Sequence, residues 1–410
     1  MNPVNPENPV NPVNVVNPVL RSAILAQMQA NKDDLIAFAQ SLVQTPSLPG
    51  QEGEAAELVR REMLALDYDR VWIDEVGNVL GRVAGGDGPS LLFNGHLDHV
   101  DAGDPTRWPH PPFGGEIHDG ELWGRGAVDM KGAVASMVYA GGLVRRLGAP
   151  LPGDLIVSAV VQEEIGGLGA RHLARTLPVA RAVIGEASGN QLRRGHRGRV
   201  ELIAHFEGRS VHASMPDLGV NPHFSLARFL AGLRKLPMAA DPTFGASSVA
   251  PTRLTSEPTS ANVTPAALHL VLDWRNIPGE RTTSIVSKLQ ELLDGSLEPG
   301  CRGSIEVAAK ELVSYTGAVR RYPDEFPSFT TSLDHPFLVR AQAGLSAMLD
   351  RAVDVGVWRF ATDGGHLAEA GVTVLGFGPG DDTVVHTIQE RLPLTQLVES
   401  TAGYMALAFV

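Results

Sequence analysis

Cysteine and long apolar runs are both scarce in this sequence. Cys301 is the only cysteine, so no intrachain disulfide can form. This fits a reducing cytoplasm, where we expect the protein to reside. No stretch approaches the roughly 18 consecutive apolar residues that a transmembrane helix needs. We therefore expect no membrane partner.

Positive charge is scarce relative to negative charge. The 410 residues include 34 Lys and Arg against 46 Asp and Glu, a formal net charge of −12. This balance argues against nucleic acid or an anionic membrane as a partner, although a local Arg could still hold a small anionic substrate. With 43% hydrophobic residues the chain can bury a large core, and its length predicts two or three domains.

Residues 1–18 differ in composition from the rest, because the dipeptide Asn-Pro recurs five times there. Proline removes a backbone donor and biases the preceding residue away from helix. We expect an extended or disordered tail. It has neither a basic start nor an apolar centre, so we do not expect it to be a signal peptide.

Apolar runs alternate with helical patterns over 19–194 and again over 313–410. Short runs at 91–93, 154–162 and 182–184 predict buried strands. Strands that alternate with helices predict an α/β domain with a mixed, mainly parallel sheet flanked by helices. Ligands of such sheets lie at the carboxyl ends of the strands.

Residues 195–312 follow a different pattern, an alternation of strand and helix in the order β-α-β-β-α-β. This order is typical of a ferredoxin-like α+β domain. Candidate site residues resume only after it, so we expect it to be an insertion into the first domain. The predicted elements are 199–206, 226–236, 248–255, 267–273, 282–293 and 304–308.

Imidazole and carboxylate side chains follow several of the predicted strands. His96 and Asp98 end the run at 91–93, and in an extended chain both point to one face. A carboxylate there can orient a metal-bound imidazole through its other N–H. A single His-x-Asp pair occurs by chance in many chains, so the metal-site prediction depends on the whole set. The remaining candidates are Asp129, Glu163, Glu164, Glu186 and His386.

Glu163 and Glu164, taken alone, would indicate the start of an exposed helix, because paired glutamates often stand there. If the pair continues the strand, adjacent side chains point opposite ways. One carboxylate can then face a metal while its neighbour faces the attacking water.

These motifs, taken in order, resemble the M20 family of metallopeptidases and amidohydrolases. That family includes acetylornithine deacetylase, succinyl-diaminopimelate desuccinylase, aminoacylase and a glutamate-releasing carboxypeptidase. The similarity runs from about residue 34 to the C-terminus. It is carried by GHLDHV (95–100), DGELWGRGAVDMKG (119–132), QEEIGGLGAR (162–171), IGEAS (184–188) and FGPG…H…E (377–390).

The resemblance implies a zinc-peptidase-like domain that binds two divalent metal ions. Zinc is the first expectation, and cobalt or manganese suits the same imidazole and carboxylate ligands. The implied ligands are Asp129 as the bridge, His96 and Glu186 on one ion, and Glu164 and His386 on the other.

Other site residues are also implied by the resemblance. Glu163 is the general base, Asp98 orients His96, and the Asp129–Met130 peptide bond is cis. The inserted domain is a lid that often mediates dimerisation.

Three residues of the expected lid complete the implied site. His212 matches the family's lid histidine, which reaches an active site, commonly that of the partner subunit, and steadies the oxyanion. Asn262 and Arg275 match substrate-side positions, and an Arg there can grip a carboxylate with two hydrogen bonds. Taken alone, His212 would more often be structural and Arg275 a surface residue.

We predict a metal-dependent hydrolase that cleaves the amide bond of an N-acyl amino acid and forms a homodimer through the lid. Glu186 favours a deacylase or a carboxypeptidase, because the family has Glu there in those enzymes and more often Asp in di- and tripeptidases. A metallo-carboxypeptidase or dipeptidase acting on a short peptide is the alternative. A metal-binding protein without turnover would lack Glu163 or a ligand, and none is missing.

Overall fold

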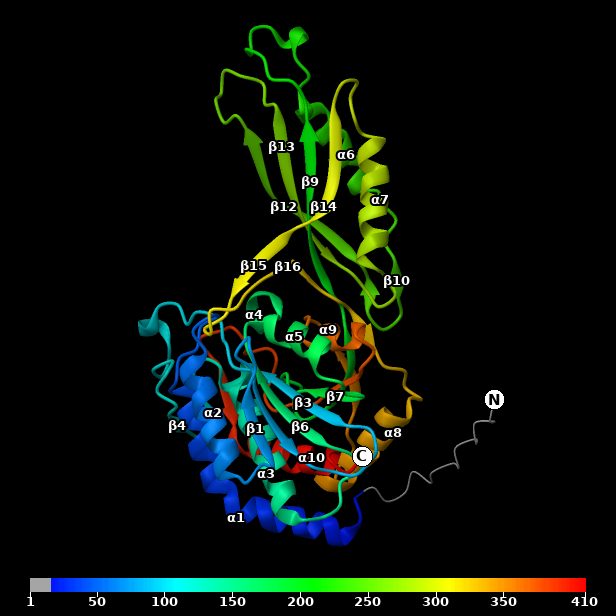
Figure 1. The fold of residues 1–410 in the computed structure, drawn as a ribbon. Coiled ribbons are helices and arrows are strands. Elements are labelled where there is room, and N and C mark those ends of the chain that lie inside the picture. Colours follow the sequence, from blue (N-terminus) through cyan, green and yellow to red (C-terminus); the bar gives the residue numbers. More distant parts are fainter. Residues whose placement is uncertain (1–15) are drawn as a thin grey trace, which may run out of the picture.

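The computed structural model describes residues 16–410 and divides into two parts (Figure 1). A nine-stranded sheet with helices on both faces forms what we call the main domain. A narrower sheet with two helices, the small domain, projects from it. The tail expected at 1–18 lies outside the described residues except for its last three, and Pro18 already begins helix α1 (Pro18–Val43).

The main sheet is parallel at its centre and antiparallel toward its edges. Its strand order is β1-β2-β6-β3-β7-β20-β8-β18, with β19 also paired to β8. Strands β6, β3, β7 and β20 run parallel, which confirms the predicted α/β fold with a mixed sheet. The bounds are β1 (Arg70–Ile73), β2 (Val79–Val83), β3 (Leu91–His96), β6 (Leu155–Val160), β7 (Arg181–Ile184), β8 (Leu192–His196), β18 (Phe329–Thr330), β19 (Val355–Trp358) and β20 (Thr373–Gly376).

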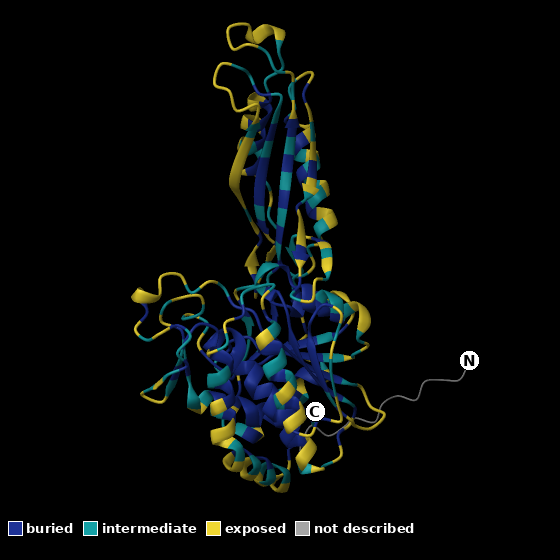
Figure 2. Ribbon diagram, turned by 60° about the vertical axis from the view of Figure 1, so that its left-hand side comes forward, coloured by how far each residue is buried: buried dark blue, intermediate teal, exposed yellow. Residues whose placement is uncertain are grey.

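Helices cover both faces of this sheet, so β3 and β6 are buried at every residue (Figure 2). This burial explains why both strands are mostly apolar rather than alternating. One face packs against α1, α2 (Gly53–Ala65), α3 (Gly132–Leu147), α8 (Pro336–Leu349) and α10 (Leu394–Leu407). The other face packs against α5 (Leu168–Thr176) and α9 (Gly364–Glu369).

The small domain is an antiparallel sheet, β12-β13-β9-β14, covered on one side by α6 and α7. Along β9, buried and half-buried residues alternate, as expected for a sheet with one covered face. The chain order is β-α-β-β-α-β, as the sequence predicts. The bounds are β9 (Arg199–Glu207), α6 (Pro222–Leu233), β12 (Ser248–Glu257), β13 (Ala267–Arg275), α7 (Thr282–Asp294) and β14 (Arg302–Val307).

The two domains are joined by more than a simple linker. A hairpin of β15 (Ala309–Val313) and β16 (Val319–Pro323) follows the small domain, and β17 (Glu325–Phe326) still pairs with β9. Leu312 and Tyr322 of the hairpin pack against Val76 and Leu168 of the main domain. The domain limits at 194/195 and 312/313 stay predictions.

Several short elements are absent from the sequence prediction. A three-stranded sheet joins β4 (Ile117–His118) and β5 (Glu121–Trp123) to the distant β21 (Arg391–Pro393). A second small pair is β10 (Ala240–Asp241) with β11 (Gly245–Ala246), and short 3-10 turns lie at η1 (Pro105–Arg107) and η3 (Pro216–Leu218). Within residues 16–410, no helix combines the length and apolar character needed to cross a membrane.

Candidate metal centre and active site

Seven of the predicted site residues meet at the carboxyl ends of the parallel strands. Strand β3 pairs in parallel with both β6 and β7, and its last residue, His96, lies opposite Val160 of β6. Residues that follow these strands therefore converge. The assembled side chains are His96, Asp98, Asp129, Glu163, Glu164, Glu186 and His386.

Asp129 lies at the centre of this cluster, with one imidazole at each of its two oxygens. Its Oδ1 is 2.9 Å from His96 Nε2, and its Oδ2 is 2.9 Å from His386 Nε2. Asp129 is carried by η2 (Ala127–Lys131), a short π-helical turn that is interrupted at this residue. The peptide bond to Met130 is cis, as the resemblance implies.

Each imidazole also contacts a glutamate. His96 Nε2 is 3.5 Å from Glu186 Oε1, and His386 Nε2 is 3.0 Å from Glu164 Oε1. Atoms bound tetrahedrally to zinc at about 2.0–2.1 Å lie about 3.4 Å apart. The spacings of 2.9–3.5 Å are therefore close to those of two ion sites that share Asp129.

Glu163 belongs to this cluster but to neither of the two implied ligand sets. One oxygen of Glu163 lies within 4.8 Å of donor atoms of His96 and Glu186. Its side chain is buried, with 7% of the residue exposed. The pair Glu163–Glu164 begins the short helix α4 (Glu163–Gly166) rather than extending a strand. We expected the two side chains to point in opposite directions because the pair would be extended. This reason was wrong, since the pair is helical and neighbouring side chains on a helix diverge by only about 100°.

The carboxylate of Asp98 holds the start of α4. Its two oxygens accept hydrogen bonds from the backbone N–H groups of Glu163 and Glu164, both at 3.0 Å. His96 Nδ1 lies 2.9 Å from the carbonyl oxygen of Asp98 and 3.6 Å from its carboxylate. The backbone carbonyl of Asp98 is therefore the closer partner of the ring and orients it. Because a carbonyl oxygen can only accept, the proton must be on Nδ1. The other nitrogen, Nε2, can then bind a metal ion.

Glu52 binds the backbone one residue before the two N–H groups that Asp98 accepts. It is fully buried, and its Oε1 accepts the N–H of Gln162 at 3.2 Å and that of Gly50 at 3.0 Å. Gln162 has a left-handed backbone with φ of 57°. Three successive N–H groups, at 162, 163 and 164, thus point at carboxylates that fix the turn carrying Glu163.

Glu390 supports Asp129 in a similar way. Its Oε1 accepts the N–H groups of Val128 and Asp129 at 3.1 and 3.2 Å, and its Oε2 is 2.5 Å from Arg125. Both Glu390 and Arg125 are buried, and Arg125 also lies over the ring of Trp108. This pair connects the strand β21 region to the loop that carries the central carboxylate.

Burial and charge shift the pKa values of the cluster. Burial raises the pKa of Glu163 well above its usual range and that of Glu186 to about 7. Burial would lower the pKa of His96, but hydrogen bonds to Asp129 and Glu186 raise it well above its usual range. Hydrogen bonds to Asp129 and Glu164 raise the pKa of His386 to about 10. The buried carboxylates of the cluster are therefore stabilised by positive charge, which protons or divalent ions can supply.

The three predicted residues of the small domain do not join this cluster. His212 is exposed and forms an isolated bridge with Val263, beyond the end of β9 that lies farthest from the main sheet (Figure 1). Asn262 lies beside it, and its carbonyl accepts the N–H of Ala213 at 2.9 Å. Arg275 ends β13 at the base of the small domain and is paired with Asp273 at 2.6 Å.

Three residues that support the site were not assigned to it from the sequence. Nothing in the sequence marks Glu52, because it lies outside every motif. Glu390 belongs to the quoted H…E motif, which marks it without showing what it binds. Asp363 lies directly before α9. It is buried, burial raises its pKa to about 7, and Asn94 donates to it at 3.3 Å.

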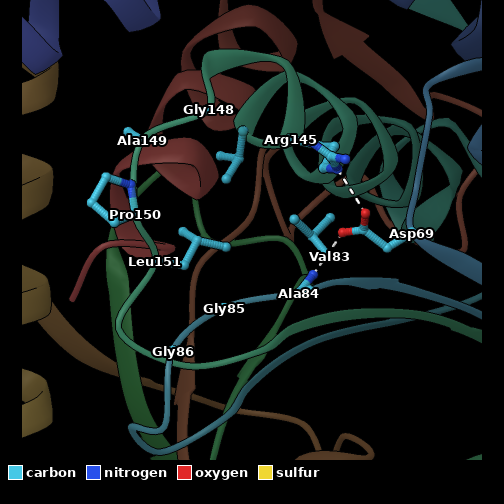
Figure 3. A pocket seen from close by; sticks show the side chains of 11 residues that line it. Asp69, Val83, Ala84, Gly85, Gly86, Arg145, Gly148, Ala149, Pro150 and Leu151 are labelled. Atoms are coloured by element: carbon cyan, nitrogen blue, oxygen red, sulfur yellow. Dashed lines mark hydrogen bonds and ion pairs between the residues drawn. The ribbon is translucent and has the colours of Figure 1, made fainter.

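A hollow of about 400 Å³ lies away from the cluster (Figure 3). It is lined in part by Val83, Leu151 and the ion pair of Asp69 with Arg145, 2.8 Å apart. Leu151 lies shortly before the start of β6, whereas the cluster follows the other end of that strand. The hollow is therefore not part of the candidate site.

Comparison with known families decides the membership of the chain. The model of peptidase family M20/M25/M40 matches residues 92–409. The chain belongs to this family. It is therefore a hydrolase that acts on amide or peptide bonds, and its M20 membership confirms the resemblance seen in the motifs.

Curated M20 relatives match nearly the whole chain. The uncharacterised protein YgeY of Escherichia coli K12 is 30% identical over 94% of this chain and 96% of its own length. A succinyl-diaminopimelate desuccinylase of Maricaulis maris is 29% identical, covering 90% and 93%. The N-formyl-4-amino-5-aminomethyl-2-methylpyrimidine deformylase of Bacillus subtilis is 25% identical, covering 92% and 94%.

Solved structures share the M20 fold. The aminopeptidase PepT of Bacillus cereus superposes with a TM-score of 0.72 at 20% identity, over 92% of this chain and 98% of its own. The YXEP protein of Bacillus subtilis, described as a dinuclear metal-binding peptidase from the M20 family, gives 0.69 at 17% identity, over 93% and 98%.

Proposed function

We propose that this M20 enzyme hydrolyses the amide bond of an N-acyl amino acid. The observation that carries the proposal is the single carboxylate of Asp129 between two imidazoles that each contact a further glutamate. Two relatives that match over nine-tenths of the chain are named a desuccinylase and a deformylase, and succinyl and formyl groups are both acyl groups. Their names favour a deacylase over a peptidase.

Two divalent ions would complete the site. His96, Glu186 and one oxygen of Asp129 would hold one ion, and His386, Glu164 and the other oxygen of Asp129 would hold the second. Imidazole with carboxylate suits zinc, with cobalt or manganese as alternatives. Bound ions would supply a water with its pKa lowered to about 7 and would polarise the substrate carbonyl. The dinuclear description of the YXEP structure supports two ions rather than one.

Glu163 would move the proton in this reaction. Its carboxylate would take a proton from water and pass it to the leaving nitrogen. Asp98 would keep it in place, because the Asp98 carboxylate holds the backbone N–H groups at the start of α4. Asp363 lies close enough to Glu163 for its charge to raise the pKa of Glu163 further.

A second copy of the chain would bring His212 to the site as an oxyanion donor. His212 lies at the far end of the small domain from the cluster in its own chain. The large apolar side chains of Met215, Leu218 and Phe224 are exposed near it in sequence, at 49%, 62% and 61%. We therefore propose a homodimer that forms through the small domain. We place the protein in the cytoplasm. Asn262 and Arg275 would bind the carboxylate of the substrate.

A panel of acylated amino acids and dipeptides tests the proposed reaction. N-acetyl, N-succinyl and N-formyl amino acids and simple dipeptides would be assayed with zinc, cobalt or manganese and again after chelation. Metal-dependent cleavage of one acyl class is the expected result. Cleavage of dipeptides alone would replace the deacylase proposal with the dipeptidase alternative, and activity that survives complete chelation would overturn it.

A further inference from the structure

A second group of metal-ligating side chains lies outside the candidate active site. It comprises His110, Glu116 and His118, whose donor atoms all lie within 4.8 Å of one another. His118 Nε2 is 2.7 Å from Glu116 Oε2, and His110 Nδ1 is 3.6 Å from the same oxygen. We propose that these three residues form a separate site for a zinc-like divalent ion.

The spacing of the three donor atoms fits a tetrahedral ion. Atoms bound to zinc at about 2.0–2.1 Å lie about 3.4 Å apart, and the distances of 2.7 and 3.6 Å from the Glu116 oxygen to the two imidazole nitrogens bracket that separation. The two imidazole rings stack face to face with their centroids 3.7 Å apart, and one nitrogen of each contacts the same carboxylate oxygen. The planes of stacked rings are nearly parallel, so the rings must rotate apart for both nitrogens to face one ion, and the partial exposure of the two side chains leaves room for this rotation.

The backbone around this group is fixed by contacts with other elements. Glu116 and His118 flank the start of β4, and the carbonyl of Glu116 accepts the N–H of Trp123 in β5 at 2.9 Å. The edge of the His110 ring packs on Trp123, with centroids 4.9 Å apart. The intervening loop is tied to α1, because Gln40 and Gln44 donate to the carbonyl groups of residues 115 and 114. The three donors are therefore held near one another before an ion arrives, which lowers the entropic cost of binding.

Solvent and ions can reach this group. The side chains of His110, Glu116 and His118 are 26%, 44% and 43% exposed. Two imidazoles and one carboxylate leave a fourth position for water, and this ligand set selects zinc, copper or nickel over magnesium or calcium.

A bound ion would fasten the loop that follows the active-site strand β3 to the hairpin β4–β5. That hairpin leads into the loop of Asp129 and pairs through β5 with β21, next to Glu390. The proposed role is therefore to stabilise the frame of the active site from outside. It does not depend on the identity of the substrate or on turnover.

A second histidine pair in the chain offers a matched control. The Nδ1 atoms of His205 and His269 are 2.7 Å apart across the small-domain sheet, and His205 Nε2 is 3.0 Å from Glu306 Oε1. His205 uses opposite ring nitrogens for these two contacts, so their donor atoms do not converge on one point. We expect no tight zinc site there.

Zinc content per chain tests the proposal directly. The full chain and its His118→Gln, His110→Gln and His205→Gln variants would be dialysed against the same zinc-buffered solution and analysed for bound metal. Both His118→Gln and His110→Gln should hold one zinc ion fewer per chain than the unmodified protein, and His205→Gln should hold the same number. Circular dichroism checks that each variant is folded.

The difference in zinc content between the unmodified protein and its variants is informative however many ions the active site binds. Equal zinc content in all four folded proteins would overturn the proposal. Loss of an ion in His205→Gln as well would also overturn it, because binding would then follow any exposed histidine. A failure of the proposed hydrolase would instead appear as absent turnover with this zinc difference intact.

Discussion

At the residue scale, the candidate site consists of donors to an ion and of carboxylates that hold the backbone of those donors. Asp98, Glu52 and Glu390 all accept backbone N–H groups next to a proposed ligand or next to Glu163. Positions in a sequence can identify ligands by residue type and by strand ends. They do not reveal which carboxylate will accept which N–H, because that depends on chain segments far apart in sequence.

Glu163→Gln separates proton transfer from metal binding. The amide cannot take a proton from water, so kcat should fall by roughly 10²–10⁴-fold. Metal content should stay nearly unchanged, because Glu163 is outside both ligand sets. Elemental analysis beside steady-state kinetics measures both quantities, and a joint loss of metal and turnover would assign Glu163 to the ligands instead.

Glu52 should make stability depend on pH. Burial and the nearby charge of Asp98 raise its pKa from 4.5 to about 7. The folded chain therefore binds this proton more tightly than the unfolded chain, so the free energy of unfolding falls as pH rises from 4.5 to 7. Glu52→Gln keeps an acceptor for the same N–H groups without the charge. At pH 8 it should be more stable than the unmodified protein by up to about 3 kcal/mol.

Urea unfolding of the chelated proteins on both sides of this pH window measures the effect. Below pH 4.5 the two proteins should differ little, since Glu52 is then protonated in both states. Glu52→Ala serves as the control that leaves the N–H groups of Gly50 and Gln162 unpaired, and it should be less stable than Glu52→Gln by about 1–3 kcal/mol at every pH. A difference between Glu52→Gln and the unmodified protein that is constant with pH would contradict this account.

At the scale of elements, the runs that end in site residues are the most predictable. Leu91–Phe93 and Ala182–Ile184 are short and apolar because parallel strands are covered on both faces, and the ligands follow their carboxyl ends. The sheet β4-β5-β21 is not predictable in the same way. Its strands have two or three residues, and β21 joins from the far end of the sequence.

The buried pair of Arg125 and Glu390 tests the importance of that small sheet. Glu390→Ala leaves the guanidinium of Arg125 buried without its partner, which should cost about 3–5 kcal/mol of unfolding free energy. Glu390→Gln retains an acceptor for the N–H groups of Val128 and Asp129 and should cost clearly less. Denaturant unfolding of both variants is the measurement. Both variants remove the charge pair, so equal losses would show that the hydrogen bonds from Val128 and Asp129 contribute little and that the charge pair accounts for the effect.

At the scale of the whole molecule, the ferredoxin-like order of the small domain was predictable from its alternating strands and helices, but the position of His212 was not. Sequence order says which element carries His212, whereas its distance from the cluster depends on how the domain projects. The three predicted residues of the small domain therefore stay apart from the seven that converge, and a partner chain is the proposed solution.

Mixing two inactive variants tests this exchange between subunits. His212→Ala should lower kcat by roughly 10²–10³-fold, the effect of losing one oxyanion donor. A hybrid dimer of His212→Ala with Glu163→Gln would contain one site with both residues intact. Random exchange should then restore about a quarter of the sites, because half of the dimers are hybrids with one intact site each. No recovery after verified subunit exchange would show that His212 does not act across a dimer.

Asp129 is proposed to join two metal ions, and anomalous X-ray scattering at the zinc edge would locate both of them. At the active site, crystals of the zinc-loaded protein should show two anomalous peaks, one on each side of the Asp129 carboxylate, in addition to any peak at His110, Glu116 and His118. His96 and Glu186 should bind the first ion, and His386 and Glu164 the second. A single ion held by His96, Glu163 and Glu186, or no ion at Asp129, would contradict the account.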